Sequence, residues 1–193
     1  MSASAHMDVR TASSGRQRFI LLLAVMAVLG CGVLAASIHG PSAPLPPGAM
    51  LPPLDLVDWR TGSARPLEAS SKPTIVILVR SDCSYCKEQL TDMAERFDSL
   101  RTARFVLVTS ESAPPANYAD RWPRLAADSA VTWVRAPAAQ LTAALHTQAT
   151  PSTFIFDHAG QLRRSFRGLT GVGAIERELV SAASDSTLAR SPH

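Results

Sequence analysis

The 193-residue sequence lacks a cluster of metal ligands and also lacks a concentrated patch of positive charge. Its five histidines lie far apart, and no two have the spacing of about three to five residues that zinc sites use. The 19 basic and 16 acidic residues give a net charge of only +3, and the basic residues are scattered along the chain. A nucleic acid is therefore not an expected partner. A chain of 193 residues has room for one domain of about 100 to 150 residues with flanking segments, and no internal repeat is evident.

Cysteine is scarce as well, which restricts what Cys83 and Cys86 can do together. The remaining cysteine, Cys31, lies in a long apolar segment, so a structural zinc site would be short of ligands. A disulfide between Cys83 and Cys86 would close a very small loop and would constrain the unfolded chain little, so a purely stabilising bond explains the pair poorly. Redox chemistry fits the spacing better, and we expect neither a metal nor a cofactor.

Charge is absent from residues 19–38, an apolar run of twenty residues. As a helix that rises about 1.5 Å per residue, the run would span about 30 Å, enough to cross a bilayer. Three arginines precede the run and the next basic residue is Arg60, so the positive-inside rule predicts a cytoplasmic tail at 1–18 and export of the chain after residue 38. In a bacterium, this corresponds to a single-pass inner-membrane protein whose domain lies in the periplasm, where disulfides form.

Two alternatives to this uncleaved anchor stay open. One is a cleaved signal peptide, although the apolar core of such a peptide is normally shorter. The other is a lipoprotein signal, which residues 28–31 (VLGC) resemble and in which Cys31 would be acylated. All three possibilities deliver the following domain to the same side of the membrane.

The rest of the chain divides by composition. Residues 39–53 hold six prolines and almost no charge, which predicts an extended spacer without packed structure. Residues 54–183 alternate between strand-like and helix-like patterns, and residues 184–193 should form a flexible tail. Alternating elements imply crossover connections, and the turn at 158–161 implies an antiparallel pair, so we expect a small α/β fold with a mixed central sheet flanked by helices.

The expected elements follow from local patterns. Apolar, β-branched runs predict buried strands, and apolar residues repeating every three or four positions predict helices. A short strand or hairpin is expected in 54–66, and strands are expected in 74–79, 104–110, 130–136, 152–157 and 162–168. Helices are expected in 86–100, 115–127 (interrupted at Pro123), 138–147 and 171–184. Thr170 should cap the last helix, whose apolar stripe would comprise Val172, Ile175, Leu179 and Val180.

The position of the cysteine pair, between a buried strand and a helix, suits thiol chemistry. If the helix begins near Cys83, its backbone N–H groups and dipole stabilise a thiolate there and should lower the pKa of the thiol. Cys86 lies one turn further on the same face and is the natural resolving thiol. Lys87 favours the thiolate, whereas Asp82 opposes it if its side chain turns inward. Glu88 is either a proton relay or a solvated surface residue.

A second informative segment is Thr150-Pro151 at the start of the strand at 152–157, where proline is tolerated in any case. The combination of strand, Cys-x-x-Cys, helix and a later Thr-Pro before a strand and hairpin resembles the thioredoxin fold. That resemblance implies a cis Pro151 packed against the cysteines, with Thr150 offering its backbone to an extended substrate. Tyr85 is then either an aromatic platform for the incoming chain or a cover for the sheet.

More narrowly, the apolar run, the proline spacer and the segment TPSTFIFDHAGQLRRSFRGLTG resemble the membrane-anchored TlpA and ResA branch over residues 51–182. Three positions depart from the pattern. Asp82 replaces the usual tryptophan, Gln89 replaces a carboxylate of this branch, and Ile77 stands where some thioredoxins carry an interior acid. The sequence Cys-Ser-Tyr-Cys is also similar to that of the periplasmic disulfide isomerases, but residues 39–73 are too few for their dimerisation domain.

The resemblance implies a membrane-tethered thiol:disulfide oxidoreductase that reduces disulfides in exported proteins. Its electrons would come from a membrane donor of the DsbD or CcdA type. An oxidase or isomerase of the same fold, and a non-catalytic thioredoxin-like binding module, stay open as alternatives.

Overall fold

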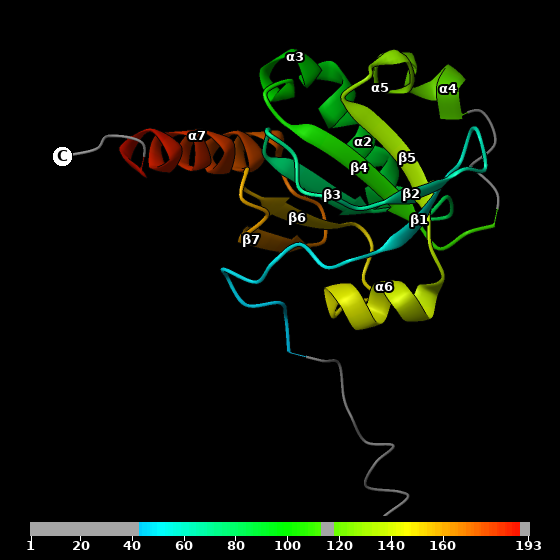
Figure 1. The fold of residues 1–193 in the computed structure, drawn as a ribbon. Helices are drawn as coiled ribbons and strands as arrows, with labels where there is room; N and C mark the ends of the chain where they lie inside the picture. The colour runs from blue at the N-terminus through cyan, green and yellow to red at the C-terminus, as the bar shows by residue number, and fades with distance from the viewer. Residues whose placement is uncertain (1–42, 113–117, 190–193) are drawn as a thin grey trace, which may run out of the picture. The chain divides into compact units, whose positions relative to one another are not determined.

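The computed structural model describes residues 43–112 and 118–189 (Figure 1). Within these two ranges, no helix combines the length and the apolar character needed to cross a membrane. The predicted tail at 1–18 and anchor at 19–38, with Cys31, lie outside the described residues, so both stay predictions. The residues from Ala43 onward form one compact unit.

The described residues build a mixed sheet of seven strands, as the alternating sequence pattern predicts. Its strands are β1 (Asp55–Asp58), β2 (Ala64–Pro66), β3 (Thr74–Leu78), β4 (Arg104–Thr109), β5 (Val131–Arg135), β6 (Ser152–Phe156) and β7 (Leu162–Arg167). They lie side by side in the order β2-β1-β5-β4-β3-β6-β7. β3, β4 and β5 are parallel, and the remaining pairs are antiparallel.

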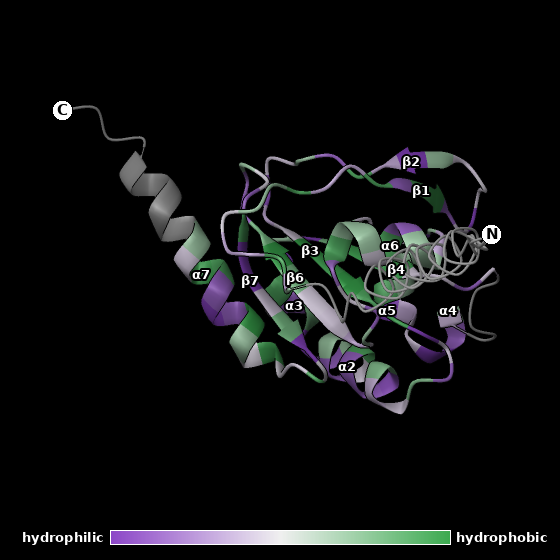
Figure 2. Ribbon diagram, turned by 90° about the horizontal axis from the view of Figure 1, so that it is seen from below, coloured by the Kyte–Doolittle hydropathy of each residue, from purple (hydrophilic) through white to green (hydrophobic). Residues whose placement is uncertain are grey.

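Helices cover both faces of the sheet (Figure 1). They are α2 (Ser84–Glu95), α3 (Phe97–Leu100), α4 (Tyr118–Arg121), α5 (Pro123–Ala127), α6 (Ala138–Leu145) and α7 (Val172–Ala189). Successive residues of a strand point to opposite faces, so Ile75 and Ile77 of β3 pack in the core beneath α2 and α7, while Val76 and Leu78 pack in the core beneath α6. Figure 2 accordingly shows β3 and β4 as hydrophobic.

Most of the expected elements are confirmed, including the short hairpin that opens the domain and the interruption of the helix before Pro123. The helix expected over 86–100 is divided at Arg96 into α2 and α3. The apolar residues that repeat along it are all buried: Cys86, Leu90, Met93, Phe97 and Leu100. The turn between β6 and β7 places Gly160 at a φ of +78°, which glycine adopts without steric cost.

The prediction of an unpacked spacer at 39–53 is wrong for its described part. Leu45 is only 9% exposed and belongs to the core beneath α6. The backbone N–H groups of Gly48 and Leu51 donate to the carbonyls of Leu162 and Gly160 at 2.7 Å each. The open edge of the hairpin between β6 and β7 offers these acceptors, so the proline-rich segment lies along the hairpin instead of standing away from the domain.

Two details of the last helix also differ from expectation. α7 begins at Val172, so Thr170 is not its N-cap, and the Thr170 hydroxyl donates to the carbonyl of Gly168 instead. Val180 is 67% exposed, because it lies about 100° around the helix from the buried Leu179. α7 continues to Ala189, beyond its expected end at residue 184, so the expected tail is helical over 184–189. Residues 190–193 lie outside the described residues, so the flexible tail stays a prediction there.

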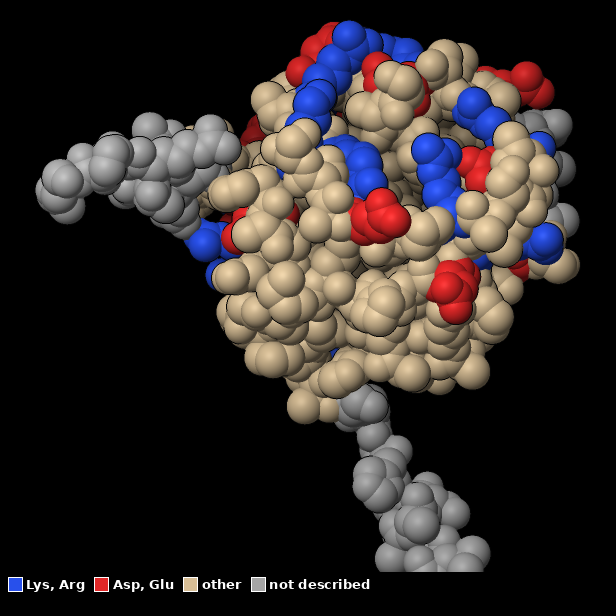
Figure 3. Space-filling view, in the orientation of Figure 1, with Lys and Arg blue, Asp and Glu red and all other residues tan. Residues whose placement is uncertain are grey.

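Charge is dispersed on the surface drawn in Figure 3. Basic and acidic side chains lie interspersed over its upper part, and its lower part is mostly uncharged. This face therefore has no continuous stripe of one sign.

Candidate active site

The cysteine pair lies where β3 gives way to α2. Cys83 is the N-cap of α2, with the extended backbone angles φ −88° and ψ 112°. The backbone N–H of Cys86 donates to Cys83 Sγ over 3.1 Å, so the sulfur accepts one of the free N–H groups at the helix start. This placement of Cys83 at the positive end of a helix is the one that the sequence predicts, and it favours negative charge on the sulfur.

The two sulfurs differ in their surroundings. Cys83 is partly exposed, whereas Cys86 is 1% exposed and packs in the core beneath α2. Burial, reinforced by the adjacent Cys83 sulfur, raises the pKa of Cys86 to about 12. Both thiols are free in this structure. The pair therefore consists of one accessible sulfur and one buried sulfur that keeps its proton at neutral pH.

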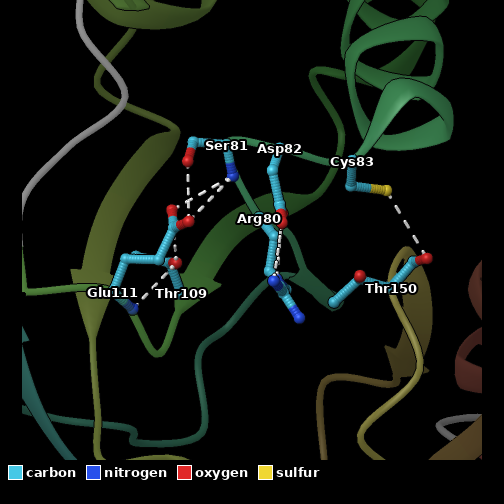
Figure 4. Close-up of polar contacts among 7 residues, drawn as sticks. All are labelled: Arg80, Ser81, Asp82, Cys83, Thr109, Glu111 and Thr150. Carbon is cyan, nitrogen blue, oxygen red and sulfur yellow. Dashed lines mark hydrogen bonds and ion pairs between the residues drawn. The ribbon is translucent and has the colours of Figure 1, made fainter.

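The Thr150-Pro151 loop lies against Cys83, as the resemblance implies. The peptide bond before Pro151 is cis, and the Cys83 thiol donates to the Thr150 carbonyl over 3.5 Å (Figure 4). The sheet brings these distant segments together, because β6 pairs antiparallel with β3 and places Ser152 beside Leu78. The loop that precedes β6 therefore meets the segment that follows β3.

The side chains of Tyr85, Glu88 and Asp82 have no hydrogen bond to either cysteine among the contacts of the described residues. Tyr85 is 60% exposed, so it does not cover the sheet and leaves the platform interpretation open. Glu88 is exposed on the outer face of α2, which favours the solvated alternative over a relay to the buried Cys86. Asp82 turns toward Arg80, with which it forms two contacts of 3.0 and 2.7 Å, instead of toward the cysteines (Figure 4).

The two interior departures from the family pattern are filled by uncharged side chains. Ile77 is fully buried in the core beneath α2. Gln89 is also fully buried, and its amide both donates to the carbonyl of Thr170 and accepts from the N–H of Thr170, each at 2.7 Å. Gln89 thereby joins α2 to the segment before α7, and neither position supplies a carboxylate to accept a proton from Cys86.

Sequence reasoning missed Glu111, which follows the end of β4. Its carboxylate accepts hydrogen bonds from the backbone N–H and the hydroxyl of Ser81, two residues before Cys83 (Figure 4). The available signal was topological: β3 and β4 are parallel neighbours, so the residues after both strands meet at one edge of the sheet. A carboxylate after the second strand then lies near the loop after the first.

The comparisons with known proteins agree with this geometry. A family model described as a thioredoxin-like domain matches residues 64–183, more than half of the chain. No curated protein matches.

Several solved structures share the fold. A thiol:disulfide interchange protein DsbE, so described, from Chlorobium tepidum matches with 19% identity and a TM-score of 0.55, covering 72% of this chain and 98% of its own. A thio-disulfide isomerase from Thermus thermophilus matches with 23% identity and a TM-score of 0.54, covering 72% and 97%. StoA from Bacillus subtilis matches with 17% identity and a TM-score of 0.51, covering 67% and 98%. With a cis-proline loop over a Cys-x-x-Cys pair and a family match across most of the domain, the chain belongs to the thioredoxin-like family.

Proposed function

We propose that the chain is a membrane-tethered thiol:disulfide oxidoreductase that reduces disulfides in exported proteins through Cys83 and Cys86. The observation that carries the proposal is the asymmetry of the two thiols. Cys83 is partly exposed and accepts an N–H at the start of α2, whereas Cys86 is buried with a raised pKa. Dithiol exchange uses such a difference, because an accessible thiolate attacks the substrate disulfide and a second, protected thiol then releases the substrate.

In the first step, the Cys83 thiolate attacks one sulfur of the substrate disulfide. A bond forms between Cys83 Sγ and that sulfur, the substrate S–S bond breaks, and the other substrate sulfur leaves as a thiolate that takes up a proton. The Thr150 carbonyl, which accepts from the Cys83 thiol in the free protein, becomes available to a backbone N–H of an extended substrate chain.

In the second step, Cys86 loses its proton and attacks Cys83 Sγ. The mixed disulfide breaks, the remaining substrate sulfur leaves and is protonated, and Cys83 and Cys86 become a disulfide. The substrate thus gains two electrons and two protons. The raised pKa of Cys86 reflects its burial and the adjacent Cys83 sulfur. The second cause weakens once Cys83 is bonded to substrate, so the resolving thiol becomes easier to deprotonate at the stage that needs it.

The cycle closes when an electron donor reduces the Cys83–Cys86 disulfide. In an oxidising compartment, a membrane donor of the DsbD or CcdA type is the proposed partner. Residues 19–38 supply the proposed anchor, which keeps the domain close to such a donor. The Chlorobium protein that shares the fold is named a thiol:disulfide interchange protein, which agrees with this chemistry.

Trapping tests the proposal. In cells that express the full chain with Cys86→Ser, we expect mixed disulfides between Cys83 and exported proteins, because the second step is blocked. Cys83→Ser is the matched control and should trap nothing. If both variants trap nothing under conditions where a known exported reductase does, the exchange mechanism is wrong and a binding module becomes the better account.

The reduction potential decides the direction. A value below about −250 mV would support a reductase, and a value near about −120 mV would identify an oxidant. The potential is measured by equilibration with glutathione or dithiothreitol buffers and quantification of the free thiols.

A further inference from the structure

Glu111 holds the loop that leads into the cysteine pair. The Ser81 N–H lies 3.2 and 3.0 Å from the two carboxylate oxygens, and the Ser81 hydroxyl donates to Oε1 over 2.6 Å. The Thr109 hydroxyl donates to Oε2 over 3.3 Å, and the Glu111 N–H donates back to that hydroxyl over 3.2 Å. Figure 4 shows the carboxylate between the end of β4 and the loop.

The ion pair between the side chains of Arg80 and Asp82 does not tie this loop to the sheet. Arg80 and Asp82 pair with each other, and their side chains are 50% and 65% exposed. The Cys83 N–H donates to the Arg80 carbonyl, which is also a contact within the loop, and its length of 3.4 Å makes it weak. Among the described residues, the contact of Ser81 with Glu111 is therefore the side-chain attachment that links the loop to the neighbouring strand β4.

We propose that Glu111 is a positioning residue, which acts through Ser81 to keep Cys83 Sγ beside the Cys86 N–H and the Thr150 carbonyl. This inference rests on the proposed function for its biological meaning, but the geometry it describes exists in the free protein. Cys83 follows Ser81 by only two residues, so release of Ser81 allows Cys83 to move off the helix start. The sulfur then loses the N–H contact of 3.1 Å that favours its thiolate.

Charge and position act in opposite directions here, which makes the inference testable. A carboxylate near a thiol disfavours the thiolate, so removal of the charge alone would move the titration of Cys83 to lower pH. Loss of positioning would move it to higher pH. Glu111→Gln removes the charge but keeps an oxygen in the place of Oε1, which accepts from the Ser81 hydroxyl at 2.6 Å and from its N–H at 3.2 Å. Its amide group takes the place of Oε2 beside the Thr109 hydroxyl, so the 3.0 Å contact with the Ser81 N–H is lost. Glu111→Ala removes both the charge and the attachment.

The experiment is alkylation of Cys83 by iodoacetamide as a function of pH, on the full chain in detergent, with fragment mass spectrometry to separate Cys83 from Cys86 and Cys31. We expect Glu111→Ala to move the midpoint of the profile up by about half a pH unit, equivalent to roughly a threefold lower rate near neutral pH. Glu111→Gln should stay at or below the wild-type midpoint. Glu95→Ala, which removes an exposed carboxylate near the end of α2, is the control for net charge.

Equal downward shifts in Glu111→Ala and Glu111→Gln would show that Glu111 acts only through its charge and would overturn the proposal. A Glu111→Ala profile that matches Glu95→Ala would overturn it as well. If Glu111→Ala does not fold, Ser81→Ala decides by the same criterion, because it removes the hydroxyl contact of 2.6 Å and should shift the midpoint upward by a smaller amount. Alkylation needs only the thiol, so its outcome is independent of substrate trapping with Cys86→Ser.

Discussion

Replacement of Gln89 by leucine should destabilise the domain strongly, although leucine has a similar size and suits a buried position. Gln89 is fully buried, and its amide forms two hydrogen bonds of 2.7 Å with the backbone of Thr170, which is itself 4% exposed. Leucine leaves the Thr170 N–H and carbonyl unpaired and out of contact with water. An unsatisfied buried group costs about 1 to 3 kcal/mol, so the two together predict a loss of about 3 kcal/mol in the free energy of unfolding.

Thermal and urea denaturation followed by circular dichroism measure this loss. For a domain of this size, a loss of about 3 kcal/mol lowers the Tm by roughly 6 to 12 °C. Gln140→Leu in α6 makes the same chemical change at a partly exposed position, and we expect it to alter stability by less than about 0.5 kcal/mol. If Gln89→Leu is no less stable than Gln140→Leu, the amide does not hold α2 to the segment before α7 and the reasoning fails.

Gln89→Glu adds a pH signature to the same test. One oxygen of the introduced carboxyl accepts from the Thr170 N–H, but the other faces the Thr170 carbonyl and requires a proton to bond with it. Burial and this carbonyl raise the folded-state pKa of the introduced carboxyl above its unfolded value of about 4.3. The variant should therefore be most stable below that value and should lose stability as the pH rises through the folded-state pKa. A Tm difference from wild type that is constant between pH 4 and pH 8 would contradict this account.

Two further predictions follow from burial. Burial is the largest cause of the raised pKa of Cys86 and persists when Cys83 is replaced. In Cys83→Ser the Cys86 thiol should therefore resist iodoacetamide at pH 8, under conditions where Cys83 reacts in Cys86→Ser. Similar rates by mass spectrometry would contradict the assigned asymmetry. The hydroxyl of Tyr118 is buried without a hydrogen-bond partner among the described residues, and burial raises its pKa. Tyr118→Phe should therefore leave the free energy of unfolding, measured by urea denaturation, unchanged or raise it by up to about 1 kcal/mol. A decrease of more than about 1 kcal/mol would show that the hydroxyl has a hydrogen-bond partner.

Local patterns were sufficient for the elements that form the site. The run at Thr74–Leu78 is β-branched and apolar because the strand is buried on both faces, and the spacing of Cys86, Leu90 and Met93 reflects the buried face of α2. The Cys-x-x-Cys spacing indicates one helical turn, and the Thr-Pro motif indicates the loop opposite it. The strand and the helix can be predicted because their patterns depend on residues close in sequence. The cysteine pair and the Thr-Pro loop can be predicted because both motifs are typical of one family.

Contacts between distant residues were not predictable in the same way. The bond from Gln89 to Thr170 joins positions 81 apart, and a single glutamine in a helix gives no pattern that identifies its partner. The proline-rich segment around Leu45 has the composition of an unpacked spacer, but its fate depends on backbone groups exposed by the hairpin near Leu162. The composition of a segment indicates its conformation in isolation, but it does not indicate which exposed strand edge the segment will pair with.

The topology of the sheet explains why the candidate chemistry lies at the end of β3. The strand has a parallel neighbour on one side, which brings Glu111 to the segment before Cys83, and an antiparallel neighbour on the other, which brings Thr150 and Pro151 to the sulfur itself. The helix that begins at this point supplies the N–H group. Cys83 is therefore held by the first turn of its own helix and by two segments that are remote in sequence. Because Cys86 lies one turn inside the same helix, a change in the seating of Cys83 alters the reactive sulfur while the resolving sulfur stays in the core. Reactivity of the pair should therefore respond to the loop around Ser81 more than to substitutions on the exposed face of α2.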